Sequence, residues 1–281
     1  MNAARTLTDD VIARLEACND PRLRRVMISL VRHLHDFVRD VEPSADEWRQ
    51  GVDFLTATGQ ISSARRQEFI LLSDTLGLTM LVDALAHPKP PGATASTIFG
   101  PFYTGQQPVL PTDASIVKGE GGPLARVHGR VLDGDGRPVA GATIEVWQAA
   151  PNGLYDTQDP AQPPGNLRGT FVSAADGSYA FRTTLPAPYP IPDDGPVGRL
   201  LRATGRHPWR PAHIHYLVHA DGYDRLVTHA FLAGSDYLDS DTVFGVKGSL
   251  VVAPTTDPAS GEVTLAFDLV LSARAATPPR P

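Results

Sequence analysis

The spacing of the apolar residues changes partway along the chain, and this change constrains the fold most. In Leu23–Val41 the apolar residues recur every three or four positions, which predicts one apolar face of an amphipathic helix. Ser44 and Glu47 form a capping box that predicts the start of a second helix. A third helix is predicted over Ser63–His87, although it contains the weak helix former Gly77. The first third of the chain is therefore expected to be helical.

After about residue 97 the apolar residues alternate with polar ones in short segments, as in Thr143–Trp147 and His213–His219. Turns that contain glycine or proline separate roughly eight such segments, which is typical of a β-sandwich. Residues 185–210 hold many prolines and glycines and are predicted to form a long functional loop. The predicted fold is mainly β with an α-helical N-terminal part. A helical domain is expected over residues 1–97 and a β-sandwich domain over residues 98–281.

Charge and cysteine content narrow the classes of function. The 281 residues carry a formal net charge of -6, so the chain is not expected to bind nucleic acid or an anionic membrane surface. The single cysteine, Cys18, excludes an internal disulfide and fits a reducing compartment. No signal-peptide pattern opens the chain, and no apolar run approaches the roughly 20 residues that span a bilayer. These features predict a cytoplasmic protein without membrane insertion.

The most informative local motif is His213-Ile214-His215, which lies in a predicted strand. Alternate side chains of a strand share a face, so the two imidazoles are expected to point the same way. Two imidazoles on one face are suited to bind zinc, copper or iron. They are equally compatible with two hydrogen-bonded histidines on a half-exposed strand, and the motif alone leaves both interpretations open.

Two tyrosines lie in segments that are predicted to be loops. Tyr155 follows the strand that ends near Trp147, and Tyr189 stands between Pro188 and Pro190, which restrict its backbone. A tyrosine in a loop usually packs its ring and leaves its hydroxyl in water, and tyrosine is a rare metal ligand. The residue pattern alone therefore does not decide whether either tyrosine binds a metal.

Longer motifs go further than single residues. The segments VWQAAPNGLYD, PYPIP, GRHPWRPAHIH and YLDSDTVFGVKGSL, together with FILLSD and STIFGPFY nearer the N-terminus, are distributed along most of the chain. In these motifs the sequence resembles the intradiol ring-cleavage dioxygenases of aromatic catabolism. This resemblance implies an Fe3+ cofactor bound by Tyr155, Tyr189, His213 and His215 and by a water or hydroxide. It also implies an oxidoreductase that uses O2 to cleave a catechol-type ring between its two hydroxyls.

The resemblance assigns further roles within this reaction. The substrate is expected to displace Tyr189, which then acts as a catalytic group, while Tyr155 stays in place. Arg210 is expected to stabilise the negative charge that develops on the ring, although it could equally form a surface ion pair. The residues expected to bind the substrate are Met80, Leu81, Asp83, Ile98, Phe99, Gly100, Pro101, Phe102, Ile191, Pro192, Arg210 and Val243.

The loop sequence PYPIPDDGPVGRLL most resembles the branch of the family that cleaves hydroxyquinol (benzene-1,2,4-triol) to 3-hydroxy-cis,cis-muconate or maleylacetate. Asp83 is a candidate acceptor for the third hydroxyl of this substrate, or else an aspartate on a helix surface. His229 stands where simple catechol dioxygenases usually carry glutamine. Catechol and chlorocatechol remain the alternative substrates.

Two other classes of protein stay open at this point. The segment VHGRVLDGDGRPVAGATIEVWQ also resembles transthyretin-like sandwich modules, which bind or space without catalysis. An iron(II) oxygenase that uses two histidines and a carboxylate is a third possibility. The family resemblance further implies that the N-terminal helices form a homodimer, in some members with phospholipid bound at the helical interface.

Overall fold

The computed structural model describes residues 3–63, 66–105, 107–119 and 124–274. The chain divides into two compact units, Met1–Ala57 and Thr58–Pro281, and each is described by itself. The domain boundary predicted between residues 97 and 98 is a separate matter from these two units, and it stays a prediction. The helices are α1 (Ala3–Leu15), α2 (Pro21–Val41), α3 (Ala45–Ile61), α4 (Glu68–Thr75), α5 (Leu78–Ala86), α6 (Pro196–Ala203) and the short 3-10 helix η1 (Gly248–Leu250).

The first unit consists of helices, as the apolar spacing predicts. The N-terminus of α2 is capped by Asp20, whose carboxylate accepts hydrogen bonds from the backbone N–H groups of Arg22 and Leu23. The predicted capping box is confirmed, because the Ser44 N–H donates to Glu47 and the Glu47 N–H donates to the Ser44 hydroxyl. The apolar face of α2 is exposed in the single chain through Leu23, Val26, Leu30, Leu34, Phe37, Val38 and Val41.

The predicted single helix over Ser63–His87 is wrong. The chain forms α4 and α5 instead, which are bent by 80° at the break between them. Gly77 adopts a φ of +72°, a left-handed conformation that ends α4 and that an L side chain would strain. No single helix among the described residues is long and apolar enough to span a membrane, and the bent pair α4–α5 meets that test only by length and composition.

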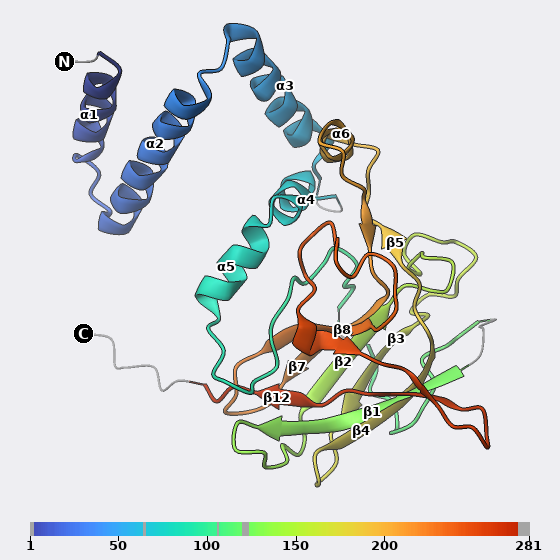
Figure 1. The fold of residues 1–281 in the computed structure, drawn as a ribbon. Coiled ribbons are helices and arrows are strands. Elements are labelled where there is room, and N and C mark those ends of the chain that lie inside the picture. The colour runs from blue at the N-terminus through green and yellow to red at the C-terminus, as the bar shows by residue number, and fades with distance from the viewer. Residues whose placement is uncertain (1–2, 64–65, 106, 120–123, 275–281) are drawn as a thin grey trace. The chain divides into compact units, whose positions relative to one another are not determined.

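Two sheets form the sandwich of the second unit (Figure 1). One sheet has the order β10-β11-β1-β12, with β4 also paired to β1, and the other has the order β3-β2-β7-β8-β9. The core between them contains buried side chains of both sheets, such as Val127, Phe181, Ile144 and Tyr216. The strands are β1 (Leu124–Asp133), β2 (Thr143–Gln148), β3 (Arg168–Val172), β4 (Ser178–Thr184), β5 (Tyr189–Pro190), β6 (Trp209–Arg210), β7 (His213–His219), β8 (Leu226–Leu232), β9 (Val251–Val252), β10 (Thr255–Thr256), β11 (Val263–Ala266) and β12 (Leu269–Leu271).

The sandwich confirms the predicted strands, with two refinements. The apolar segment 263–271 forms two strands, β11 and β12, which pair in parallel with successive parts of β1. The segment 185–210, predicted as a loop, contains α6 and the two strands β5 and β6. β5 and β6 pair antiparallel, so that Tyr189 lies directly opposite Arg210. A two-stranded ribbon therefore presents both residues at one place.

Candidate metal centre

His213 and His215 share one face of β7, as the alternation of the strand predicts. β7 lies between β2 and β8, and both imidazoles are buried, with 1% of each residue exposed. The Nε2 atoms of the two histidines are 3.2 Å apart. Ile214 lies on the other face of the strand and is buried in the core between the two sheets. The half-exposed strand considered above is therefore excluded, and the pair faces an enclosed site.

Both tyrosine hydroxyls meet this histidine pair. The Tyr155 hydroxyl lies 2.9 Å from Nε2 of His215, and the Tyr189 hydroxyl lies 3.4 Å from Nε2 of His213. The two phenol rings meet edge to face, with their centroids 5.3 Å apart. Tyr189 comes from β5 and not from a loop, whereas Tyr155 follows the turn after β2 and stacks on Phe102. Four donor atoms from three segments of the chain thus converge at one buried point.

The hydrogen bonds of His213 show which of its ring nitrogens can bind a cation. Nδ1 lies 2.7 Å from the carbonyl oxygen of Pro211. A carbonyl only accepts, so Nδ1 carries the proton and Nε2 keeps its lone pair. Burial, followed by the charge of Arg210, lowers the pKa of His213 well below its usual value, so the ring is neutral. The lone pair of Nε2 therefore faces His215, Tyr189 and, at 3.2 Å, Nη1 of Arg210. A metal cation placed between the two histidines and Tyr189 would be bound by all three.

Tyr155 needs such a cation to ionise. Burial raises the pKa of Tyr155 well above its ordinary value, and the neighbouring Tyr189 raises it further. A phenolate at this position is stable only beside a strong positive charge. Two neutral imidazoles and two phenols of this kind form a donor set that fits a metal ion of high charge.

Arg210 lies at the edge of the four donors. Its Nη1 lies 3.4 Å from the Tyr189 hydroxyl, while its Nε donates to Asp241 at 3.1 Å. Burial alone would lower the pKa of Arg210, but the carboxylate of Asp241 and the tyrosine oxygens outweigh it and raise the pKa. Arg210 does form an ion pair, but a buried one, with a fixed positive charge beside Tyr189.

A cavity of about 340 Å³ opens onto Tyr189 and Arg210. Most of the residues predicted to bind substrate line it: Ile98, Phe99, Gly100, Pro101, Phe102, Ile191, Pro192, Arg210 and Val243. Its remaining lining residues are Gln67, Ile70, Leu71, Asp74, Thr79 and Tyr189. The volume and the largely apolar wall suit one small aromatic ring.

Three predicted residues lie elsewhere, because the break at Gly77 turns α5 away from the direction of α4. Met80 is buried in an apolar cluster behind the cavity, and Leu81 is 56% exposed. The Asp83 carboxylate accepts a hydrogen bond from Ser96 at 2.6 Å and lines a different, smaller cavity of about 250 Å³. Contrary to the expectation from the resemblance, Met80, Leu81 and Asp83 therefore do not line this cavity.

Asp74, which the sequence analysis missed, takes the place expected for Asp83. It lies in α4 on the cavity wall, is 6% exposed, and its Oδ1 has no hydrogen-bond partner among the described residues. Burial raises the pKa of its carboxyl group. The sequence did carry a signal, since Leu71 and Asp74 are three apart and share a helix face. Because a single helix was predicted up to residue 87, the direction of the helix face that carries Leu71 and Asp74 was not predicted.

Comparisons with known proteins agree with this site. The family model described as "Dioxygenase" matches residues 98–273, and the model described as "Catechol dioxygenase N terminus" matches residues 20–94. The chain is 52% identical over 266 residues to 6-chlorohydroxyquinol 1,2-dioxygenase of Cupriavidus pinatubonensis, covering 95% of this chain and 96% of that protein. It is 53% identical over 244 residues to hydroxyquinol 1,2-dioxygenase of a Rhizobium species, covering 86% and 83%.

A solved structure gives the same result. The fold is similar to the crystal structure of hydroxyquinol 1,2-dioxygenase from Pseudomonas putida DLL-E4, with a TM-score of 0.92 and 48% sequence identity. The match covers 97% of this chain and 99% of that one. With a helical region followed by a β-sheet domain, and with both family models matched, the chain belongs to the intradiol ring-cleavage dioxygenases.

Proposed function

We propose that this protein is a hydroxyquinol 1,2-dioxygenase. It would cleave hydroxyquinol between its adjacent hydroxyls and incorporate both atoms of O2, giving 3-hydroxy-cis,cis-muconate, the enol form of maleylacetate. The observation that carries this proposal is Asp74, a buried carboxylate with a free oxygen on the wall of the cavity that holds Tyr189 and Arg210. Relatives that carry this name support it, and family membership contradicts a non-enzymatic binding module.

We infer that the metal is Fe3+, bound by Tyr155, Tyr189, His213 and His215. Two phenolates offset most of the charge of a ferric ion, and hard anionic oxygens favour this oxidation state over iron(II). The only cluster of histidine, cysteine or carboxylate ligands among the described residues contains histidines alone, which argues against an iron(II) centre with a carboxylate ligand. When bound, the ferric ion would act as a Lewis acid and template for both hydroxyls of the substrate.

The two tyrosines are suited to different tasks. The Tyr189 hydroxyl faces the cavity beside Arg210, so its phenolate can accept a proton from a substrate hydroxyl. Tyr155 is held from several sides: its ring stacks on Phe102 at a centroid distance of 4.3 Å, and its backbone N–H donates to Gln158. Tyr155 would therefore stay in place while Tyr189 exchanges with the substrate.

Arg210 supplies the electrostatic part of the mechanism. As the ring is attacked, negative charge develops on it, and a guanidinium held by Asp241 stabilises that charge without having to reorient. The apolar side chains of Ile98, Leu71 and Val243 exclude water from the same space, which strengthens this interaction. Such a preorganised charge can lower a barrier by about 3 kcal/mol.

Asp74 is the proposed specificity residue. Hydroxyquinol differs from catechol by a third hydroxyl, a hydrogen-bond donor that a buried carboxylate would accept. Catechol would leave Oδ1 of this carboxylate buried without a partner. A lost hydrogen bond to a charged group costs about 1.5–3 kcal/mol, so discrimination of roughly ten- to a hundredfold is expected.

The test compares kcat/KM for hydroxyquinol and catechol, measured by oxygen uptake, in the wild type, in Asp74→Leu and in Asp83→Leu. Asp74→Leu is expected to lose about ten- to a hundredfold on hydroxyquinol, while catechol turnover is held or improved, because the acceptor is gone. Asp83→Leu removes a carboxylate outside the cavity, so its effect should be equal on both substrates. If Asp74→Leu weakened both substrates equally, hydroxyquinol specificity would lose its structural basis.

We further propose that the protein is a cytoplasmic homodimer with phospholipid bound at its helical interface, as the family resemblance implies. The exposed apolar face of α2 supports this pairing, because a monomer would leave seven large apolar side chains in water, Leu23, Val26, Leu30, Leu34, Phe37, Val38 and Val41. Sedimentation of the wild type tests the dimer, and extraction followed by phosphorus analysis tests the lipid.

A further inference from the structure

His229 is a buried histidine that the proposed reaction does not use. It lies on β8 directly opposite His215 on β7 and is fully buried. Its Nε2 is 2.7 Å from Nδ1 of His215, and its Nδ1 is 3.0 Å from the hydroxyl of Thr97. Thr97 is itself 4% exposed. A continuous chain of hydrogen bonds thus runs from Thr97 through His229 to a proposed metal ligand.

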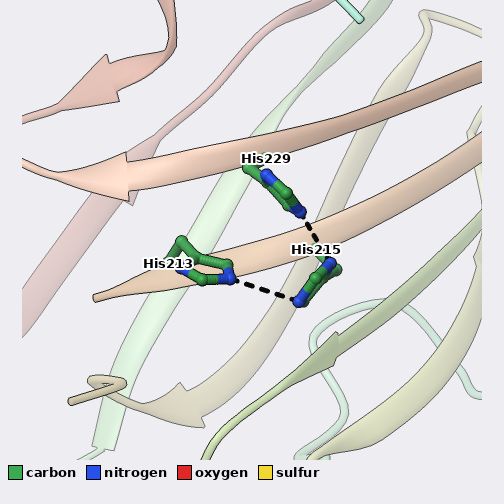
Figure 2. Close-up of side chains that lie close together, drawn as sticks. All are labelled: His213, His215 and His229. Atoms are coloured by element: carbon green, nitrogen blue, oxygen red, sulfur yellow. Dashed lines mark hydrogen bonds between the residues drawn. The ribbon is translucent and has the colours of Figure 1, made fainter. Parts of the chain in front are cut away.

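The position of His229 makes it a neighbour of the ligand set and not a member of it. Figure 2 shows His215 bonded to His213 through one ring nitrogen and to His229 through the other. Nε2 of His215 faces the Tyr155 hydroxyl, whereas His229 contacts Nδ1, on the other side of the ring. The three histidines lie close enough to hold a metal together, but the phenol oxygens lie on the Nε2 side.

The protons of this chain can be arranged in two ways. If the Thr97 hydroxyl donates to His229, then His229 donates to Nδ1 of His215, and the proton of neutral His215 must sit on Nε2. That tautomer cannot bind a metal through Nε2. In the opposite arrangement His229 donates to the Thr97 oxygen through Nδ1 and accepts from His215 at Nε2. His215 then keeps a lone pair on Nε2, which points at the Tyr155 hydroxyl.

We propose that His229, oriented by Thr97, is a positioning residue that fixes His215 in the tautomer and ring orientation that bind the metal. This inference rests on the metal centre of the proposed function. Metal-bound histidines usually donate their second N–H to an acceptor, and losing that acceptor costs about 10–100-fold in metal affinity. A neutral imidazole fills this role without adding a negative charge behind a site that already holds two phenolates.

The experiment measures iron binding directly. Apoprotein is titrated with iron(III) nitrilotriacetate, and the ferric–tyrosinate absorption band reports both affinity and band position. His229→Leu removes the acceptor and is expected to lower affinity about 10–100-fold and to shift the band. His229→Gln keeps an acceptor for His215 and a donor for Thr97, so it should stay within a few-fold of the wild type.

Two threonine variants form a matched pair. Thr97→Val removes the hydroxyl that orients His229 and should lower affinity in the same direction as His229→Leu, by a smaller factor. Thr228→Val removes a buried hydroxyl on the same strand that bonds instead to the Ala95 carbonyl, and it should leave the affinity unchanged. The Thr97 pair keeps the test informative even if His229→Leu does not fold.

Each contrary outcome has its own meaning. Wild-type affinity in both His229→Leu and Thr97→Val would overturn the positioning role. A loss in His229→Gln as large as in His215→Ala would make His229 a direct ligand and would overturn it as well. Full iron binding by His215→Ala would instead remove the metal centre of the proposed function, so the two failures are distinguishable.

Discussion

The cavity has a sheet side and a helical side, and they are built by different rules. The sheet side presents Tyr189 and Arg210 of the β5–β6 ribbon, which contact His213 of β7. Its polar groups are buried and bonded to one another. The helical side comes from α4, its N-cap and α5, and it combines the apolar Ile70 and Leu71 with the polar residues Gln67, Asp74 and Thr79. In the proposed reaction, the sheet side would carry the groups that every ring substrate needs, and the helical side would carry Asp74, the proposed specificity residue.

The largest effect is expected on the sheet side, from Tyr155→Phe. The variant keeps the ring that stacks on Phe102 but loses the oxygen beside His215. It should bleach or shift the red to purple colour of ferric tyrosinate and lower kcat for hydroxyquinol and catechol alike, by about a thousandfold or more. Visible absorption and oxygen uptake measure both. A variant with wild-type colour would contradict the role of Tyr155 as a ligand.

A smaller but still uniform loss is expected from Arg210→Lys. A lysine keeps the charge but cannot bond to Asp241 and reach Tyr189 with one planar group. kcat should fall about 10²–10³-fold on both substrates, with the absorption band retained. Steady-state kinetics with both substrates check this prediction. A loss confined to one substrate would move Arg210 from charge stabilisation to recognition.

The smallest effect is expected from Gly77→Ala, on the helical side. Alanine at a φ of +72° costs about 1–2 kcal/mol, and its Cβ would lie 3.4 Å from the Phe244 ring. Thermal unfolding should show a lower Tm, and selectivity between hydroxyquinol and catechol should change more than overall turnover. Gly51→Ala is the matched control. Gly51 lies inside α3, where an added Cβ would have no atom within 4 Å apart from its neighbours in the chain and the helix backbone. This variant should stabilise the folded protein by about 0.5–1 kcal/mol.

The same contrast explains what the sequence could predict. A strand has a fixed two-residue period, so the common face of His213 and His215 followed from their spacing alone. The tyrosines have no such relation to β7, because they reach the site from separate segments, and only the family motifs identified them. The register that places His229 opposite His215 depends on the turn between β7 and β8, which periodicity does not fix.

On the helical side, the prediction of a single helix failed at Gly77. The apolar spacing continues across Gly77, so α4 and α5 read as one helix with one face. The bend of 80° separates the directions of the two halves. The family resemblance implied Asp83, which lies in the second half, whereas the aspartate that lines the cavity is Asp74 in the first half. Asp74 could be placed only once the backbone direction at Gly77 was known.

The ladder between β5 and β6 has a consequence for how this enzyme family can diversify. Tyr189 and Arg210 are main-chain partners in that ladder, so a shift of one strand carries the other with it. Exchanging residues 189–210 as a block between relatives would transfer Tyr189 and its neighbour Arg210 together. Exchanging β5 or β6 alone would pair a strand from one relative with a strand from another. We therefore expect functional exchanges to begin and end outside this segment and not within it.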